Sequence, residues 1–289
     1  MSVAEMLGRT HRLLLEQKNG EFSSLIKFPL LVSDVQISQG HVNENVVVKS
    51  ADGTLFVLRQ EIPEARNRVF EHARAEYEGS GFLENPENGY GFRSVEEQRM
   101  FSEALKKAGV LCPTVYYAKD RMQVIEFVHG ARTISDLWLN RDKNILSVTS
   151  MVLETIVKMH KAGMVAGDRW GPNELVTTDG KVYLVDFDIK IWGPEIKEFE
   201  LATLMYHLTY FLQKGQYYGS IQHLESIYMS LLTDSKTGEI YNIEIILRYL
   251  LRYAEFFASK ESSQPPYCWN KPKEGIEFFR KLRDSIIRW

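Results

Sequence analysis

In the stretch HKAGMVAGDRWGPNELVTTDGKVYLVDFD, two aspartates, Asp168 and Asp186, stand at the ends of two short apolar runs, with one asparagine, Asn173, between them. Asn173 follows Asp168 by five positions, and a turn at residues 178–180 separates Asn173 from Asp186. A hairpin with this turn would bring Asn173 and Asp186 together. Carboxylate and amide oxygens are the ligands that Mg²⁺ prefers in proteins. The spacing therefore predicts a cation site at Asn173 and Asp186, facing Asp168.

This composition suits phosphoryl transfer to a hydroxyl group. That reaction needs the phosphates held, their charge neutralised by metal, and the attacking hydroxyl aimed in line, so the protein contributes mainly positioning and electrostatics. In this interpretation Asp168 accepts or orients the proton of the hydroxyl, while Asn173 and Asp186 hold Mg²⁺.

Length, charge and cysteine content argue against a nucleic-acid-binding protein, a membrane protein or a zinc protein. The 289 residues suffice for one large domain or two lobes, and the net charge of −3 provides no overall field for nucleic acid or membrane. No apolar run approaches the roughly 18 residues of a spanning helix, and the N-terminus is predicted to be a short amphipathic helix and not a signal peptide. Cys112 and Cys268 lack histidine partners at ligand spacing, which argues against zinc. A cytoplasmic protein is expected.

A strand-rich first part precedes a mainly helical remainder, which predicts an α+β chain of two lobes, 1–128 and 129–289. Ser94 and Glu97 have capping-box spacing, so a helix is expected to begin there and to end near Gly109. Residues rich in glycine, asparagine and proline predict one long loop at 78–93. The remaining expected elements are strands at 34–38, 45–50, 54–60, 115–118 and 122–127, helices at 63–77 and 145–162, and a hairpin at 174–186. The dipeptide Asp52-Gly53 predicts a two-residue hairpin turn between the strands at 45–50 and 54–60.

These motifs together resemble the protein-kinase-like fold, especially its aminoglycoside- and choline-kinase-like phosphotransferase branch. Asp168-x4-Asn173 and the triplet Asp186-Phe187-Asp188 resemble the catalytic and metal-binding loops of that branch. Three further stretches are similar to parts of this branch. Its phosphate-covering hairpin and third strand are similar to GHVNENVVVKSADGTLFVLRQ, and its regulatory helix, the next two strands and the hinge are similar to SVEEQRMFSEALKKAGVLCPTVYYAKDRMQVIEFVHG. The start of a later helix is similar to EFELATL. The resemblance spans residues 34–205 and implies an antiparallel sheet in the first lobe and a helical second lobe.

The resemblance also implies ATP and Mg²⁺ as cofactors and further binding residues. Gly40 would let backbone N–H groups approach phosphate, although a glycine between strands also suits a plain turn. Arg59 would bind phosphate, with Glu97 as its helix partner; the alternative for Glu97 is the capping box alone. The backbone from Glu126 to Val128 would contact the purine.

The sequence departs from the family pattern near the site. Ala166 stands where the family has a histidine, and Arg59 replaces a lysine, which changes a point charge into a planar fork. Asp188 replaces a glycine; it could bind the metal directly, support the groups that bind it, or lie exposed in the loop. Arg169 and Trp170, directly after Asp168, are candidates for substrate contact, with packing as the alternative for Trp170.

The leading hypothesis is an ATP- and Mg²⁺-dependent phosphotransferase that acts on a hydroxyl of a small molecule. Arg59 and the helix-rich chain after EFELA favour a small acceptor. A second hypothesis is a pseudokinase, a nucleotide-binding or scaffold module, to which the departures at Ala166, Asp188 and Arg59 point. A third is an atypical Ser/Thr protein kinase similar to RIO-type or tRNA-modification-complex kinases, which leaves a protein substrate or partner open.

Overall fold

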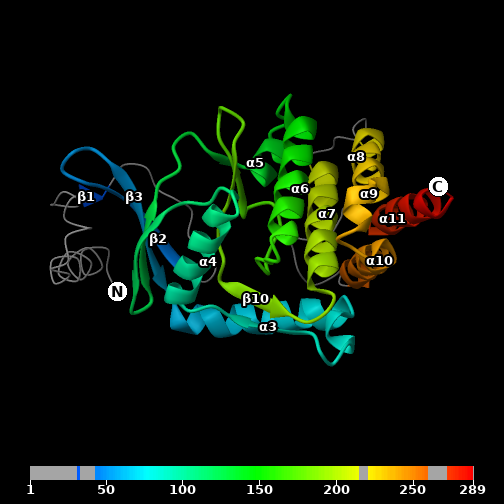
Figure 1. Ribbon diagram of the computed structural model, residues 1–289, viewed down its shortest axis with the longest axis horizontal. Coiled ribbons are helices and arrows are strands. Elements are labelled where there is room, and N and C mark those ends of the chain that lie inside the picture. Colours follow the sequence, from blue (N-terminus) through cyan, green and yellow to red (C-terminus); the bar gives the residue numbers. More distant parts are fainter. Residues whose placement is uncertain (1–30, 33–42, 215–220, 260–271, 289) are drawn as a thin grey trace. The chain divides into compact units, whose positions relative to one another are not determined.

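The computed structural model describes residues 31–32, 43–214, 221–259 and 272–288 (Figure 1). The expected N-terminal helix, the expected strand at 34–38, Gly40 and Cys268 lie outside these residues. The strands are β1 (Leu31–Val32), β2 (Asn43–Lys49), β3 (Leu55–Glu61), β4 (Gly89–Phe92), β5 (Val115–Lys119), β6 (Met122–Glu126), β7 (Arg132–Thr133), β8 (Glu174–Val176), β9 (Val182–Leu184) and β10 (Ile189–Trp192). The helices are α3 (Pro63–Gly79), the 3-10 turn η1 (Phe82–Glu84), α4 (Val95–Lys107), α5 (Ile134–Leu139), α6 (Ile145–Lys161), α7 (Ile196–Lys214), α8 (Ile221–Thr233), α9 (Ser235–Gly238), α10 (Ile243–Ser259) and α11 (Pro272–Ile287).

The chain divides into two compact units, which are described separately. Unit 1 takes the chain up to His72 together with Arg93–Ala104 and Pro113–His129. Unit 2 takes the remainder, including the segments 73–92 and 105–112, which the sequence places in the first lobe. The fold class expected from the sequence, an α+β chain with an antiparallel sheet and a mainly helical part, is confirmed.

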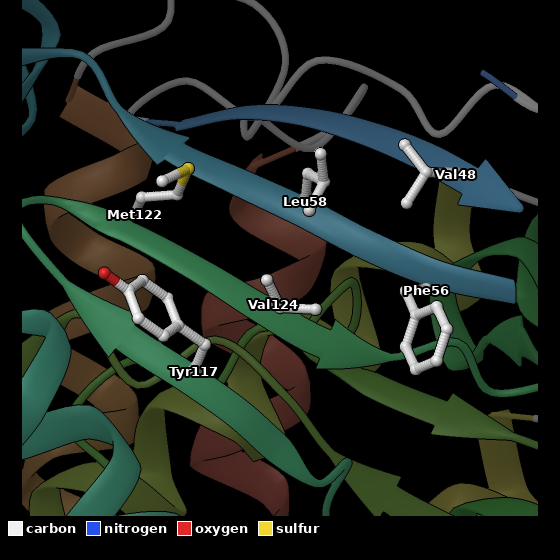
Figure 2. Close-up of a cluster of buried hydrophobic side chains, with 6 residues drawn as sticks. All are labelled: Val48, Phe56, Leu58, Tyr117, Met122 and Val124. Carbon is white, nitrogen blue, oxygen red and sulfur yellow. The ribbon is translucent and has the colours of Figure 1, made fainter. Parts of the chain in front are cut away.

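Unit 1 is built on a five-stranded antiparallel sheet in the order β1-β2-β3-β6-β5. Strands β2 and β3 form the predicted hairpin at the Asp52-Gly53 turn, where Gly53 has φ 91°, a conformation open to glycine. Cross-strand partners share a face, so Leu58 and Val124 point the same way. Figure 2 shows the resulting cluster of buried side chains on that face, namely Val48, Phe56, Leu58, Tyr117, Met122 and Val124. Burial of each Val, Leu, Phe or Met side chain of this cluster contributes about 1.5 to 3 kcal/mol to the free energy of unfolding.

The start of helix α4 confirms the predicted capping box. The Glu97 backbone N–H donates to Ser94 Oγ at 3.1 Å, and the Ser94 N–H donates to the Glu97 carboxylate at 2.7 Å. Two backbone donors that a helix start leaves without partners are thereby satisfied. Gly109 follows the helix with φ 73°, as expected for a residue that ends a helix.

Unit 2 is a group of helices in which α7 packs against α5, α6, α8 and α10, and α11 packs against α10 (Figure 1). The buried residues of α10 recur every three or four positions, so one face of this helix is apolar. They are Ile246, Leu247, Tyr249, Leu250, Tyr253, Ala254 and Phe257. Among the described residues no helix is long and apolar enough to cross a membrane.

The prediction of an unbroken loop at 78–93 is wrong, because this segment contains η1 and the strand β4. Strand β4 pairs with β10 antiparallel, and Gly89 lies opposite Trp192. A Cβ atom on Gly89 would lie 2.4 Å from the Trp192 ring, so the small residue is what lets the indole pack on the strand. The glycines that favour a loop in sequence thus make room for a side chain in a sheet.

Candidate active site

In unit 2, Asp168 and Asn173 lie close together just before the hairpin of β8 and β9. The hairpin of β8 and β9 forms as predicted, and β7 joins it as a third strand. The Nδ2 group of Asn173 donates to the Asp168 backbone oxygen at 2.9 Å and to its carboxylate at 3.3 Å. Because this commits the amide N–H₂ to Asp168, Oδ1 is the atom of Asn173 that can bind a cation.

Asp186 occupies a backbone conformation that side-chain-bearing residues seldom adopt. Its φ is 58°, in the left-handed region, where aspartate is tolerated better than most residues. The Val185 N–H, one residue earlier, donates to the Asn173 carbonyl at 3.0 Å, which closes the open end of the β8–β9 hairpin. The Asp186 carboxylate lies near enough to Asp168 to affect its ionisation.

The ionisation of Asp168 is shifted by its surroundings. Burial, followed by repulsion from the Asp186 carboxylate, raises the pKa of Asp168 from 3.8 to about 8, although the residue keeps part of its surface accessible. Glu76, on helix α3, adds to this repulsion. Strongly perturbed acids that share a site with a second carboxylate are typical of functional centres.

Arg169 is completely buried and binds backbone, not substrate. Its Nη1 donates to the Asn173 carbonyl at 3.0 Å, and its Nη2 donates to the carbonyls of Val185 and Asp186, each at 2.7 Å. Glu174, also buried, lies 3.3 Å from Nη1. The expectation that Arg169 contacts substrate is therefore wrong, since its donors are turned inward. Trp170 is partly exposed, and its ring lies 6.4 Å from that of His207.

Glu200 of α7 holds the backbone just before Asp168. Its carboxylate accepts from the N–H of Ala166 at 3.3 Å and from the N–H of Gly167. His160 forms a hydrogen bond to the same carboxylate at 2.7 Å, and its other ring nitrogen meets Tyr241. Burial alone would raise the pKa of Glu200, but the hydrogen bond from His160 and the nearby cations lower it.

Helix α3 supports the other side of this backbone segment. The Tyr77 hydroxyl donates to the Gly167 carbonyl at 3.1 Å from a buried position. Gly167 has φ 104°, and a Cβ atom there would lie 2.4 Å from the Ile189 carbonyl oxygen. The approach to Asp168 is thus fixed on both sides, and only glycine fits at 167.

The oxygen atoms of this site suit an Mg²⁺ ion that is also bound to the phosphates of a substrate. Among the residues that the structure describes, no three His, Cys, Asp or Glu side chains gather as a metal site made of protein alone would need. Mg²⁺ in phosphate-binding enzymes keeps waters and binds one or two protein oxygens plus substrate phosphates. Asn173 Oδ1 and the Asp186 carboxylate meet that smaller requirement. Asp188 is 6% exposed, which excludes the exposed alternative for this residue.

The predicted nucleotide-contacting residues of unit 1 lie on the sheet and on α4. Arg59 lies opposite Gln123 in the pairing of β3 with β6, so both point to the face of the sheet on which Gln123 is hydrogen-bonded to α4. The α4 side chain in contact with Gln123 is Gln98, at 3.2 Å, while Glu97 is exposed and caps the helix. The capping alternative for Glu97 is confirmed, and its pairing with Arg59 stays a prediction.

At the predicted hinge, Glu126 is hydrogen-bonded to Thr114. The Glu126 carboxylate accepts from the backbone N–H of Thr114 at 2.9 Å and from its hydroxyl at 2.7 Å. The Glu126 N–H itself donates to the Thr114 carbonyl at 2.8 Å. Val128 is partly buried at the end of this segment. A contact of this backbone with a purine stays a prediction.

Sequence reasoning did not find the roles of Glu200, Glu174 and Tyr77. A sequence signal for Glu200 exists, since it directly precedes the largely apolar run LATLMYHLTYF, which is buried in α7. An acid so placed needs hydrogen-bonding partners, because a carboxylate is costly to bury alone. Nothing in the spacing of Glu174 or Tyr77 identifies the backbone groups that they bind.

Comparisons with known proteins show a partial sequence match and two distant fold similarities. No family model matches the chain. It is 33% identical over 99 residues to the KEOPS complex subunit Bud32 of Pyrococcus abyssi (strain GE5 / Orsay), a match that covers 34% of this chain and 44% of that protein. The chain thus spans less than half the length of this relative.

Two solved structures are similar over nearly the whole chain. Macrolide 2'-phosphotransferase type I has a TM-score of 0.46 and 13% identity, with coverage of 99% of this chain and 98% of that one. A choline/ethanolamine kinase family protein from Mesorhizobium loti has a TM-score of 0.37 and 10% identity, with coverage of 96% and 97%.

Proposed function

We propose that this protein is an ATP- and Mg²⁺-dependent phosphotransferase that transfers the γ-phosphoryl group to a hydroxyl of a small molecule. The observation that carries the proposal is the grouping of Asp168, Asn173 and Asp186 on one loop and hairpin. Asn173 donates to Asp168, and Arg169 binds the carbonyls of both Asn173 and Asp186. Phosphoryl transfer needs this kind of fixed geometry more than it needs covalent help from the protein.

Each residue has a defined part in the proposed reaction. Asp168 accepts the proton of the acceptor hydroxyl while the hydroxyl oxygen forms its bond to the γ-phosphorus and the bond from that phosphorus to the bridging oxygen breaks. Asn173 Oδ1 and the Asp186 carboxylate hold Mg²⁺, which when bound neutralises charge on the phosphates. In unit 1, Gly40 and Arg59 are proposed to contact phosphate and the backbone from Glu126 to Val128 to contact the purine.

The test is transfer of isotopic phosphate from ATP to a panel of hydroxyl metabolites by the full chain. Asp168→Ala should abolish transfer, because no other group is proposed to take the proton. Asp179→Ala, which removes an exposed acid in the turn of the same hairpin, is the matched control and should transfer at the wild-type rate. Transfer that survives Asp168→Ala intact would reject the assigned base.

A second candidate is a kinase-like subunit that works in a protein complex. The observation that favours it is the 33% identity to a KEOPS complex subunit over 99 residues. Phosphorylation of the chain's own Ser or Thr residues, with no transfer to any small molecule, would support this candidate over the first. Thermal stabilisation by ATP and Mg²⁺ without any turnover would instead support a nucleotide-binding pseudokinase, because a ligand that binds only the folded state stabilises it.

A further inference from the structure

Arg169 connects the two segments that carry the proposed metal ligands. Within one planar guanidinium group, Nη1 binds the carbonyl of Asn173 and Nη2 binds the carbonyl of Asp186. A third hydrogen bond reaches Val185 at 2.7 Å. Because the guanidinium is rigid, these bonds fix the distance between the two backbone segments, and with it the distance between their side chains.

Glu174 holds this guanidinium in place. Its Oε1 lies 3.3 Å from Arg169 Nη1, and its Oε2 accepts from the Gly171 N–H at 2.7 Å. Both members of the ion pair have no exposed side-chain surface. A buried pair of this kind adds little net stability compared with apolar residues of the same volume, so stability alone does not account for it.

We infer that Arg169 is a positioning residue for the metal site, held by Glu174. The inference rests on the proposed function, since it concerns the same Mg²⁺ ligands. Mg²⁺ demands near-ideal octahedral geometry and binds poorly when its ligands are displaced. The three hydrogen bonds from Arg169 keep Asn173 and Asp186 at one separation before the ion arrives, so less ordering is needed on binding.

Replacement of Arg169 by lysine tests the positioning role of this residue separately from its charge. Arg169→Lys keeps a cation beside Glu174, but a single ammonium group cannot reach three carbonyls in the way that a planar fork does. The double variant Arg169→Met with Glu174→Gln removes both charges and leaves no buried ion without a partner. A purely structural role predicts that a folded double variant binds metal normally, whereas a positioning role predicts that it does not.

The experiment measures the Mg²⁺ concentration at which a non-hydrolysable ATP analogue reaches half of its full stabilisation of the folded chain. For Arg169→Lys and for the double variant, this concentration should rise about 10- to 100-fold, the usual effect of removing a group that orients metal ligands. Arg248→Lys is the matched control, because Arg248 also pairs with a carboxylate, that of Glu195 at 2.6 Å, outside the site. Its midpoint should equal that of the wild type.

The outcomes separate the two proposals. A wild-type chain whose stability does not respond to Mg²⁺ and the analogue overturns the proposed function and this inference with it. A wild-type response that either folded variant shares unchanged overturns the inference alone. If Arg169→Lys fails to fold, the double variant decides; if both fail to fold, Arg169 is required for folding itself and the separate positioning role is rejected.

Discussion

Replacement of Asp168 by asparagine should stabilise the protein without metal while it removes the proposed base. The folded-state pKa of Asp168 is raised from 3.8 to about 8, chiefly by burial and then by Asp186. The folded chain therefore binds the extra proton more tightly than the unfolded chain. The contribution of this group to the free energy of unfolding is constant below pH 4, falls as the pH rises from about 4 to about 8, and then levels off. Asparagine cannot ionise and escapes this loss.

The size of the effect follows from the shift. One pKa unit corresponds to about 1.4 kcal/mol, which sets an upper limit of about 6 kcal/mol for a shift of this size. Since Asp168 keeps part of its surface accessible, water reduces the penalty, and we expect a gain of about 1 to 3 kcal/mol at pH 8. Each kcal/mol corresponds to about 2 to 4 °C in Tm.

Denaturant unfolding of wild type and Asp168→Asn at pH 5 and pH 8, with a chelator present, measures this difference. The variant should be the more stable protein at pH 8, by a margin that is smaller at pH 5. Asp179→Asn is the control: the hydrogen bond from Lys181 lowers the pKa of this exposed acid, so its removal brings no gain at pH 8. The reasoning would be refuted if the variant were no more stable than the wild type at pH 8, or if the difference in the free energy of unfolding were the same at both pH values.

Three further changes test the supports of the site and of the fold. Glu200→Gln places an N–H₂ group among hydrogen-bond donors in a buried position, so the free energy of unfolding measured with denaturant should fall by about 2 to 4 kcal/mol. An unchanged denaturation midpoint would contradict the role of this carboxylate. Gly167→Ala should lower Tm far more than Gly163→Ala. Both glycines have positive φ, but only at position 167 would the added Cβ meet the Ile189 carbonyl. Equal losses of Tm would show that the backbone around residue 167 relaxes freely. Ser94→Ala removes a helix cap and should cost about 1 kcal/mol, measured by urea unfolding, with no change in m-value.

Local signals in the sequence predicted the elements that form through short-range chemistry. The Asp52-Gly53 turn, the capping box at Ser94 and the hairpin between Asn173 and Asp186 each depend on residues within about a dozen positions of one another. Apolar runs and helical spacing likewise predicted the strands at 45–50, 54–60, 115–118 and 122–127 and the long helix α6, while the antiparallel sheet was implied by the family resemblance. These features were confirmed because backbone geometry and burial decide them locally.

Contacts between distant segments were decided only by the tertiary structure. Strand β4 exists because β10 pairs with it, about a hundred residues later, and its glycines gave no sign of that partner. The same holds for Tyr77, whose hydroxyl binds the Gly167 carbonyl. Spacing along the chain carries no information about which backbone group a side chain will reach across the fold.

The sequence by itself determined which residue types could do chemistry here, because Asp168, Asn173 and Asp186 stand at a spacing that a loop and a hairpin can close. Only the tertiary structure decided what Arg169 does. In sequence it is a cation beside an acid and suits a substrate; in the fold its guanidinium is buried on three carbonyl oxygens and one carboxylate. The direction of a long side chain depends on which buried acceptors lie within its reach, and packing alone sets those.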